Sequence, residues 1–153
     1  MCLRSDVLDE PDSDPLQRRG PVTTRISGGQ HRGRSIKTPT FGGLRPTSER
    51  VRAAVFSIIG PDAVEGKRVL DLYAGTGALG IDALSRGAAC ADFVERDGRR
   101  RKAIRGILAQ LAMQGNARVH SGQVKKVLHR LEGPYDLCIF NTQHAADDMQ
   151  CVH

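Results

Sequence analysis

Three glycines follow a short apolar run at the spacing of a ligand-binding turn. Gly75, Gly77 and Gly80 form the pattern G-x-G-x-x-G, and the apolar run at residues 69–72 before them suits a buried parallel strand. Glycine is needed where the chain turns tightly and a ligand approaches the backbone. A helix expected over residues 78–86 would offer free N–H groups in its first turn. The stretch therefore predicts a strand, a glycine turn and a helix that together bind a nucleotide-like ligand.

Three kinds of site compete for this turn. A P-loop requires Lys followed by Ser or Thr after the last glycine, but Gly80 is followed by Ile81 and Asp82, which excludes it. A dinucleotide-binding turn stays possible. An S-adenosylmethionine (SAM) turn is favoured by Asp71 at the end of the strand. A carboxylate there suits a ligand with an ammonium and a sulfonium, and it would repel a pyrophosphate.

A second acid stands where a cofactor ribose would need it. Residues 91–95 read as another strand, and it ends in Glu95. An acid at that strand end, about 20 residues past the glycines, can accept hydrogen bonds from ribose hydroxyls. The order of strand, Asp71, glycines and Glu95 favours a cofactor site. The plain alternative is a helix-capping turn with surface acids.

The rest of the chain supplies the elements that must position these residues. Strand-like runs alternate with helical patterns, which predicts an α/β doubly wound fold with a parallel sheet. The expected strands cover residues 68–72, 91–95, 117–120 and 135–140. The helix after Glu95 has an apolar stripe that leaves its many basic residues on the exposed side; the stripe consists of Ile104, Ile107, Leu108 and Leu111.

A further helix is expected before the first strand. Pro46 with Thr47 or Ser48 predicts its start, with Ser or Thr as N-cap. Apolar residues at helical spacing predict its buried face: Val51, Ala54, Val55, Ile58 and Ile59. Arg50 and Arg52 stand near the start of this helix, and simple surface charge is the plain interpretation of both.

Basic residues gather in the first third of the chain. The net charge is +6, and residues 18–52 alone carry nine Lys or Arg against one acid, a net charge of +8. β-prone residues around Gly28-Gly29 predict a hairpin over residues 22–39. Its cations, which could lie along phosphates, are Arg25, Arg32, Arg34 and Lys37. Such a field suits a polyanionic partner; a solvated basic face is the plain alternative.

The amino-acid composition limits the class of protein to which this chain can belong. The 153 residues suit one domain, and 39% hydrophobic with 26% charged residues is ordinary for a soluble protein. No apolar run approaches the ~18 residues of a membrane span, and no signal peptide begins the chain. The four cysteines contain no C-x-x-C, so neither a metal site nor a disulfide framework is expected. We expect a cytoplasmic monomer without metal or membrane contact, with residues 1–21 as a disordered leader.

Several motifs together resemble a known family. Asp-Leu-Tyr-Ala-Gly-Thr-Gly-Ala-Leu-Gly from Asp71, followed by Phe-Val-Glu from Phe93, resembles class I SAM-dependent methyltransferases. Three motifs upstream narrow the resemblance to one family of these enzymes: Arg-Ile-Ser-Gly-Gly from Arg25, Arg-Gly-Arg from Arg32 and Leu-Arg-Pro-Thr-Ser-Glu-Arg-Val-Arg from Leu44. Together the motifs look like those of the bacterial family that methylates a guanine N2 in small-subunit (16S) ribosomal RNA. The resemblance covers about residues 23–148.

The resemblance implies a Rossmann-like class I methyltransferase fold that uses SAM and acts on ribosomal RNA or the small ribosomal subunit. Residues 22–46 would form a basic RNA-binding hairpin and loop, and residues 47–153 a SAM-binding domain. The implied cofactor residues are Asp71, Tyr73, Gly75, Gly77, Glu95 and Gln123. The implied RNA-binding and substrate-lining residues are Arg25, Arg32, Arg34, Arg45 and Thr47. Gln123 stands where the family has an Asp that binds the adenine amine, so weaker adenine binding is expected.

The catalytic motif at the end of the fourth strand is altered. Related enzymes carry Asp/Asn-Pro-Pro-Tyr/Phe at this strand end. The oxygens of the motif accept hydrogen bonds from the exocyclic amine of the target base, and its prolines hold the turn. Its aromatic ring stacks on the flipped base. This chain has Asn141-Thr142-Gln143-His144. Asn141 keeps the amide oxygen and His144 replaces the ring, but both prolines are missing. A misplacement of ~1 Å can reduce a rate about 100-fold, so we expect methyl transfer to be absent or severely reduced.

The chain stops shortly after this motif, whereas the resembled fold continues with further strands. The fourth strand would then be an unpaired apolar edge, which recruits other strands or aggregates. A truncated or frame-disturbed copy is one interpretation, and a partner chain that completes the sheet is the other.

Two rival functions stay open. A non-catalytic remnant would bind RNA with a steep salt dependence but transfer nothing. A nicotinamide-dependent Rossmann enzyme would bind NAD at the glycine turn, and Asp71 argues against it.

Overall fold

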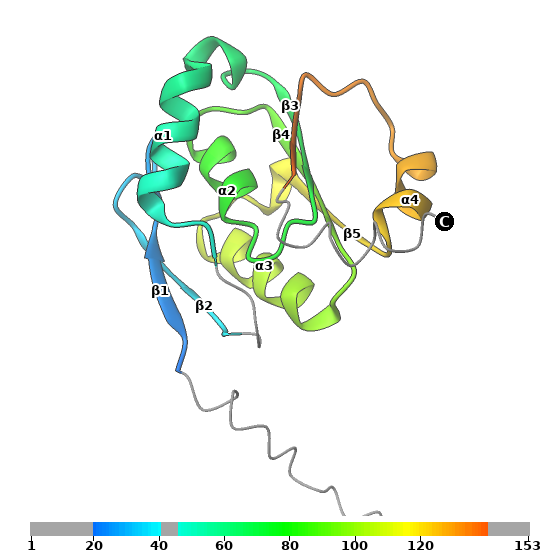
Figure 1. Cartoon of the computed structure of the whole chain (residues 1–153), viewed down its shortest axis with the longest axis horizontal. Helices are drawn as coiled ribbons and strands as arrows, with labels where there is room; N and C mark the ends of the chain where they lie inside the picture. The colour runs from blue at the N-terminus through cyan, green and yellow to red at the C-terminus, as the bar shows by residue number, and fades with distance from the viewer. Residues whose placement is uncertain (1–19, 41–45, 141–153) are drawn as a thin grey trace, which may run out of the picture.

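The computed structural model describes residues 20–40 and 46–140, so Arg45, Asn141 and His144 lie outside the described residues. A two-stranded hairpin lies beside a four-stranded sheet that has helices on both faces (Figure 1). The hairpin strands are β1 (Val22–Arg25) and β2 (Ser35–Thr38). The sheet strands are β3 (Arg68–Leu72), β4 (Cys90–Glu95), β5 (Ala117–Ser121) and β6 (Leu137–Phe140). The predicted α/β fold with a parallel sheet core is confirmed.

The strand order β5-β4-β3-β6, with every neighbouring pair parallel, places a switch point beside β3. From β3 the chain builds β4 and β5 on one side, and then returns to add β6 on the other. Doubly wound sheets bind their ligands at such a point, outside the carboxyl ends of the strands. The carboxyl end of β3 is therefore the expected place for a ligand, and the glycine turn begins there.

α2 (Ala78–Ser85) and α3 (Gly98–Gln110) cover one face of the sheet, and α1 (Glu49–Ile59) lies on the same side, outside α2 (Figure 1). A short helix, α4 (Val124–Val127), lies on the other face. Short 3-10 turns complete the connections at Pro61–Ala63, Gln114–Asn116 and Leu128–Arg130. No helix among the described residues is both long and apolar enough to cross a membrane.

Side chains along β4 alternate between the two faces of the sheet, so the strand contributes to two separate clusters of buried residues. Phe93 is fully buried against the α2 and α3 side, whereas Val94 packs with Leu70, Val124 and Val127 beneath α4. On α3 the predicted stripe is confirmed, since Ile104, Ile107, Leu108 and Leu111 are all buried. Burial of this apolar area is the main force that holds the helices on the sheet.

The predicted hairpin is also confirmed. β1 and β2 pair antiparallel from Val22 opposite Thr38 to Arg25 opposite Ser35. Ile26 is 0% and Ile36 1% exposed, and both belong to the same core cluster as the sheet. The hairpin is thus packed onto the body of the molecule through its apolar side, which leaves its charged side chains outward.

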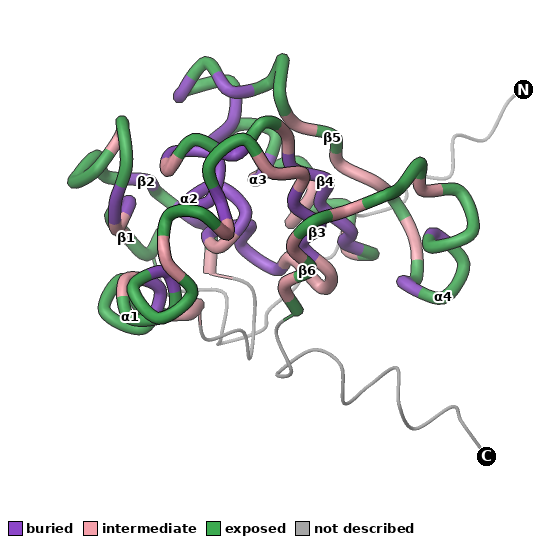
Figure 2. Tube along the Cα trace, turned by 90° about the horizontal axis from the view of Figure 1, so that it is seen from above, coloured by how far each residue is buried: buried purple, intermediate pink, exposed green. Residues whose placement is uncertain are grey.

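The predicted start of α1 is confirmed, but its predicted buried face is wrong. Ser48 is the N-cap, its Oγ accepting the Val51 N–H at 3.3 Å. Val51 is 51% and Ile58 84% exposed, and Ala54, Val55 and Ile59 are exposed as well; Figure 2 shows α1 mostly exposed. The buried residues are Arg52 and Phe56. The plain interpretation of Arg52 as a surface charge is wrong because its charge is paired inside the protein with Asp82.

β6 forms one edge of the sheet within the described part of the chain, where it pairs with β3. Phe140, its last residue, is 60% exposed.

Candidate cofactor site at the glycine turn

The chain turns in left-handed conformations directly after β3. Tyr73 has φ 55°, Gly75 60° and Gly77 74°. At Gly77 a Cβ atom would also lie 2.9 Å from Cγ1 of Ile104, so only glycine fits without a shift of the α3 side chain. The Ala74 N–H donates to the Val94 carbonyl at 3.0 Å, which attaches the turn to the neighbouring strand. The turn is therefore a fixed feature of the fold.

Asp71 lies beneath the first turn of α2. Its side chain is 1% exposed, and its Oδ2 accepts the Gly80 N–H at 3.0 Å. A Cβ on Gly80 would lie 2.3 Å from the Phe93 ring, so the glycine lets α2 pack directly on β3 and β4. A carboxylate at this position also interacts favourably with the positive end of the helix dipole.

Burial raises the pKa of Asp71 from 3.8 to about 8. Desolvation is the main cause; the negative charge of Glu95 raises the pKa further, and the Gly80 N–H opposes both by lowering it. A cation bound near this carboxyl would lower its pKa again. A buried acid perturbed in this way, at a switch point, is a candidate binding residue.

We expect this buried acid to make stability depend on pH. Its folded pKa lies above its unfolded value, so the stability present below about pH 4 is lost as pH rises toward about 8. Relative to Asp71→Asn, the free energy of unfolding of the unsubstituted protein should fall by about 1.4 kcal/mol per pH unit between about pH 5 and 7. Urea unfolding at several pH values measures this, with Asp62→Asn at an exposed acid as control. If the free energy of unfolding depends on pH in the same way in Asp71→Asn and in the parent protein, the raised pKa of Asp71 is contradicted.

Glu95 connects the glycine turn to the start of α3. Its Oε2 accepts the Gly75 N–H and its Oε1 accepts the Asp97 N–H, both at 2.9 Å. The side chain is 4% exposed, and Arg100 Nη1 lies 3.8 Å from Oε1. Because Asp71 and Glu95 are both buried, they are not the surface acids of the plain helix-capping alternative. A carboxylate oxygen can accept more than one hydrogen bond, so Glu95 retains capacity for a ligand hydroxyl.

The structure thus brings four of the predicted cofactor residues together: Asp71, Gly75, Gly77 and Glu95. Tyr73 is half-buried against the Leu70 and Val94 cluster. Gln123 follows β5 as the exposed N-cap of α4, at the same carboxyl edge of the sheet. In the described residues no group of three His, Cys, Asp or Glu side chains gathers as a metal site would.

The predicted RNA-binding residues lie on or beside the hairpin. Arg25, Arg32 and Arg34 are exposed, and Arg34 Nη1 donates to His31 Nδ1 at 3.0 Å. Thr47 is half-buried before α1, and its carbonyl oxygen accepts a hydrogen bond from Arg52.

Sequence reasoning missed a second set of polar residues, centred on the buried pair Arg52 and Asp82. One signal was available. Asp82 is the only charged residue in the otherwise apolar or small segment 78–85, and a lone charge in a buried helix needs a buried partner.

The fold is the Rossmann-like fold of class I methyltransferases. Its first sheet strand lies at the switch point, a glycine turn follows that strand, and an acid ends the next one. The chain belongs to the family described as "Conserved hypothetical protein 95", which matches residues 24–143.

Individual relatives agree with this assignment. "Ribosomal RNA small subunit methyltransferase D" of Escherichia coli (strain K12) is 42% identical over 120 residues, which are 77% of this chain and 59% of the relative. YlbH of Bacillus subtilis (strain 168) is 38% identical over 105 residues, 69% of this chain and 56% of that protein. The chain therefore spans less than two thirds of the length of these relatives.

Solved structures show the same fold. The hypothetical protein TTHA0928 of Thermus thermophilus superposes with a TM-score of 0.61 at 31% identity, over 70% of this chain and 60% of that one. The C-terminal domain of precorrin-6Y C5,15-methyltransferase from Rhodobacter capsulatus has a TM-score of 0.52 at 20% identity, over 61% and 48%, and supports the fold alone.

Proposed function

We propose that this chain has the function of a SAM-dependent methyltransferase. Its substrate would be the exocyclic N2 of a guanine in small-subunit (16S) ribosomal RNA. The observation that carries the proposal is the pair of buried carboxylates, Asp71 and Glu95, hydrogen-bonded to the glycine turn at the switch point of the sheet. The name of the Escherichia coli relative supports methyl transfer to small-subunit ribosomal RNA.

The residues at the turn fit a SAM molecule chemically. Gly75 and Gly77 adopt the left-handed conformations of a tight turn whose backbone a ligand would approach. A bound ammonium and sulfonium would lower the pKa of Asp71, so that its carboxyl ionises and supplies the negative charge they require. Glu95 would supply acceptors for ribose hydroxyls. SAM provides a methyl group activated by its positive sulfur. We assign Tyr73 to the wall of this site and Gln123 to the adenine amine.

The RNA-binding part is assigned to residues 22–46 and the SAM-binding domain to residues 47–153, after a leader of residues 1–21. The exposed cations of the hairpin would contact phosphates, which position an RNA without reading its sequence. Arg45 and Thr47 are assigned to the substrate-lining segment. The partner is ribosomal RNA or the small ribosomal subunit, and we propose that the chain acts as a monomer in the cytoplasm.

The second candidate is an RNA-binding protein that no longer transfers methyl groups. It is favoured by the segment from Asn141 to His144, which lacks the two prolines that hold the catalytic turn of related enzymes. We assign Asn141 and His144 to the catalytic positions, and the expected loss of methyl transfer stays a prediction. A single-turnover assay with labelled SAM and small ribosomal subunits separates the candidates, since turnover near that of a full-length relative would exclude the second.

Thermal unfolding with and without SAM tests the cofactor site. A ligand at ~100 times its dissociation constant stabilises the folded state by about 2.7 kcal/mol. We therefore expect a cooperative transition that rises by several degrees with SAM or its demethylated product, and does not rise with NAD. A transition that ignores SAM, or that rises only with NAD, would contradict the proposed cofactor.

A further inference from the structure

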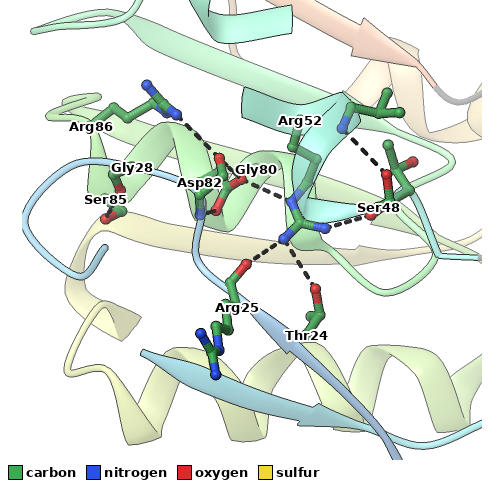
Figure 3. A network of polar contacts seen from close by, with 12 residues as sticks. Thr24, Arg25, Gly28, Ser48, Arg52, Gly80, Asp82, Ser85 and Arg86 are labelled. Carbon is green, nitrogen blue, oxygen red and sulfur yellow. Dashed lines mark hydrogen bonds and ion pairs between the residues drawn. The ribbon is translucent and has the colours of Figure 1, made fainter. Parts of the chain in front are cut away.

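Arg52 is the centre of a buried hydrogen-bond network outside the cofactor turn. Its side chain is 0% exposed, and it contacts three separate parts of the chain. Nε donates to Asp82 Oδ2 of α2 at 2.8 Å. Nη2 donates to Thr24 Oγ1 at 3.1 Å and to the Arg25 carbonyl oxygen at 2.5 Å, both on the hairpin. Nη1 donates to the Thr47 carbonyl oxygen in the segment before α1. Figure 3 shows the guanidinium reaching from α1 to both α2 and the hairpin.

Asp82 holds the hairpin from the side of α2. Besides Arg52, it accepts two hydrogen bonds from Ser27, directly after β1: the backbone N–H reaches Oδ1 at 3.1 Å and the hydroxyl reaches Oδ2 at 2.5 Å. The Asp82 side chain is 1% exposed. The carboxylate is therefore shared between α1 and the hairpin, and it has no role in the cofactor turn at the other end of α2.

The last turn of α2 adds further contacts to the hairpin loop. Ser85 Oγ donates to the Gly28 carbonyl at 2.7 Å and accepts the His31 N–H at 3.0 Å. The Ser85 carbonyl accepts the Gln30 N–H at 2.7 Å. Gly29 has φ 78°, and a Cβ there would lie 1.9 Å from the Ser85 carbonyl oxygen, so the loop and the helix end are in direct contact. α2 thus begins at the cofactor turn and ends against the basic hairpin.

A buried ion pair is a weak source of stability, since apolar residues of similar shape often stabilise a fold equally well. Its geometry is what apolar residues cannot replace. The planar guanidinium presents several N–H groups in fixed directions, and at Arg52 these directions fix the hairpin, the Thr47 segment and α2 relative to one another.

We propose that Arg52 and Asp82 are positioning residues that set the orientation of the basic hairpin, and of Thr47 beside it, relative to the cofactor turn. The proposal rests on the RNA-binding role given to the hairpin under the proposed function. It adds a specific mechanism: the hairpin cations engage several phosphates of one RNA at once because the buried pair holds the hairpin in a single orientation.

Two variants of the full chain separate orientation from stability. Arg52→Met/Asp82→Leu replaces the pair with apolar side chains of similar shape and should retain a cooperative melt. Arg52→Lys keeps the charge but cannot make the same set of directed hydrogen bonds. Arg130→Met, at an exposed cation remote from the network, controls for the loss of one positive charge.

The measurements are binding of a fluorescein-labelled RNA hairpin of small-subunit sequence at several salt concentrations, SAM binding, and amide hydrogen exchange. Both network variants should bind RNA at least about 5-fold more weakly, with a salt slope lower by about 1 because fewer phosphates are contacted together. SAM affinity should change less than 2-fold. The amides of Ser27, Gln30 and His31 should exchange at least about 10-fold faster, while those of β3 and β4 are unchanged. Arg130→Met should match the parent protein in all three.

Each result decides between the two proposals. If the parent protein binds RNA and both variants bind it with the same affinity and salt slope, the positioning role is wrong. If the parent protein binds no RNA, the RNA-binding part of the proposed function is wrong, and the exchange data decide the positioning role alone. Unchanged exchange of the hairpin amides in a folded Arg52→Met/Asp82→Leu variant overturns it; faster exchange confined to the hairpin supports it.

Discussion

The substitution Asp82→Leu is expected to lower the free energy of unfolding by about 3 to 5 kcal/mol, because it leaves a buried charge without its partner. Leu has the branched shape of Asp, so the change creates little cavity, and it favours a helix at least as well. The loss comes from Arg52, which is 0% exposed, and from the N–H and hydroxyl of Ser27, which lose their acceptor. Calorimetric melting should show a fall of about 10 °C or more.

The second substitution in the pair makes this prediction specific. Adding Arg52→Met to Asp82→Leu removes the unpaired charge, so the double variant should be more stable than Asp82→Leu alone, by about 2 kcal/mol or more. Glu132→Ala is the control, since Glu132 is 85% exposed in a loose pair with Arg118 and should change stability by less than about 0.5 kcal/mol. A double variant less stable than the single one would mean that the apolar pair does not fit the site.

This pair also shows why the sequence could not predict the packing of α1. Helical spacing assigned the apolar residues to the buried face, on the assumption that the face of a helix toward the core is apolar. Arg52 is buried instead because its partner Asp82 lies 30 positions later in the chain, and nothing local to the helix reveals that partner. Val51 and Ile58 remain exposed in the described structure as a consequence.

The glycine turn after β3 could be predicted because its signals are local. Glycines, a preceding apolar strand and an acid at each strand end occur within a short stretch, and each has a direct backbone reason. The hydrogen bonds that the two acids make with the turn could not be predicted from the sequence. That Asp71 accepts the Gly80 N–H and Glu95 the Gly75 N–H depends on how α2 and β4 pack against β3. The raised pKa of Asp71 is likewise a property of this packing, since its main cause is burial.

The largest expected effect on ligand binding is that of Glu95→Ala, which should weaken SAM binding at least about 100-fold. Hydrogen bonds to a charged acceptor contribute about 1.5 to 3 kcal/mol each, so loss of the two ribose contacts that we propose for Glu95 alone corresponds to this change. The same substitution removes the acceptor of the Gly75 and Asp97 N–H groups, so the turn that must contact the ligand is also loosened. Isothermal titration with SAM measures the effect.

A conservative variant keeps this prediction testable if Glu95→Ala does not fold. In Glu95→Gln one of the two oxygens becomes an amide NH₂, which cannot accept a hydrogen bond. Either Gly75 or Asp97 then faces a donor, and one ribose contact is weakened, so we expect an intermediate loss of about 10-fold with a cooperative melt retained. Glu132→Ala again serves as the remote control. Because Glu95 is joined to the turn by its own hydrogen bonds, a folded Glu95→Ala variant that binds SAM within 2-fold of the parent protein would place the ligand elsewhere on the sheet.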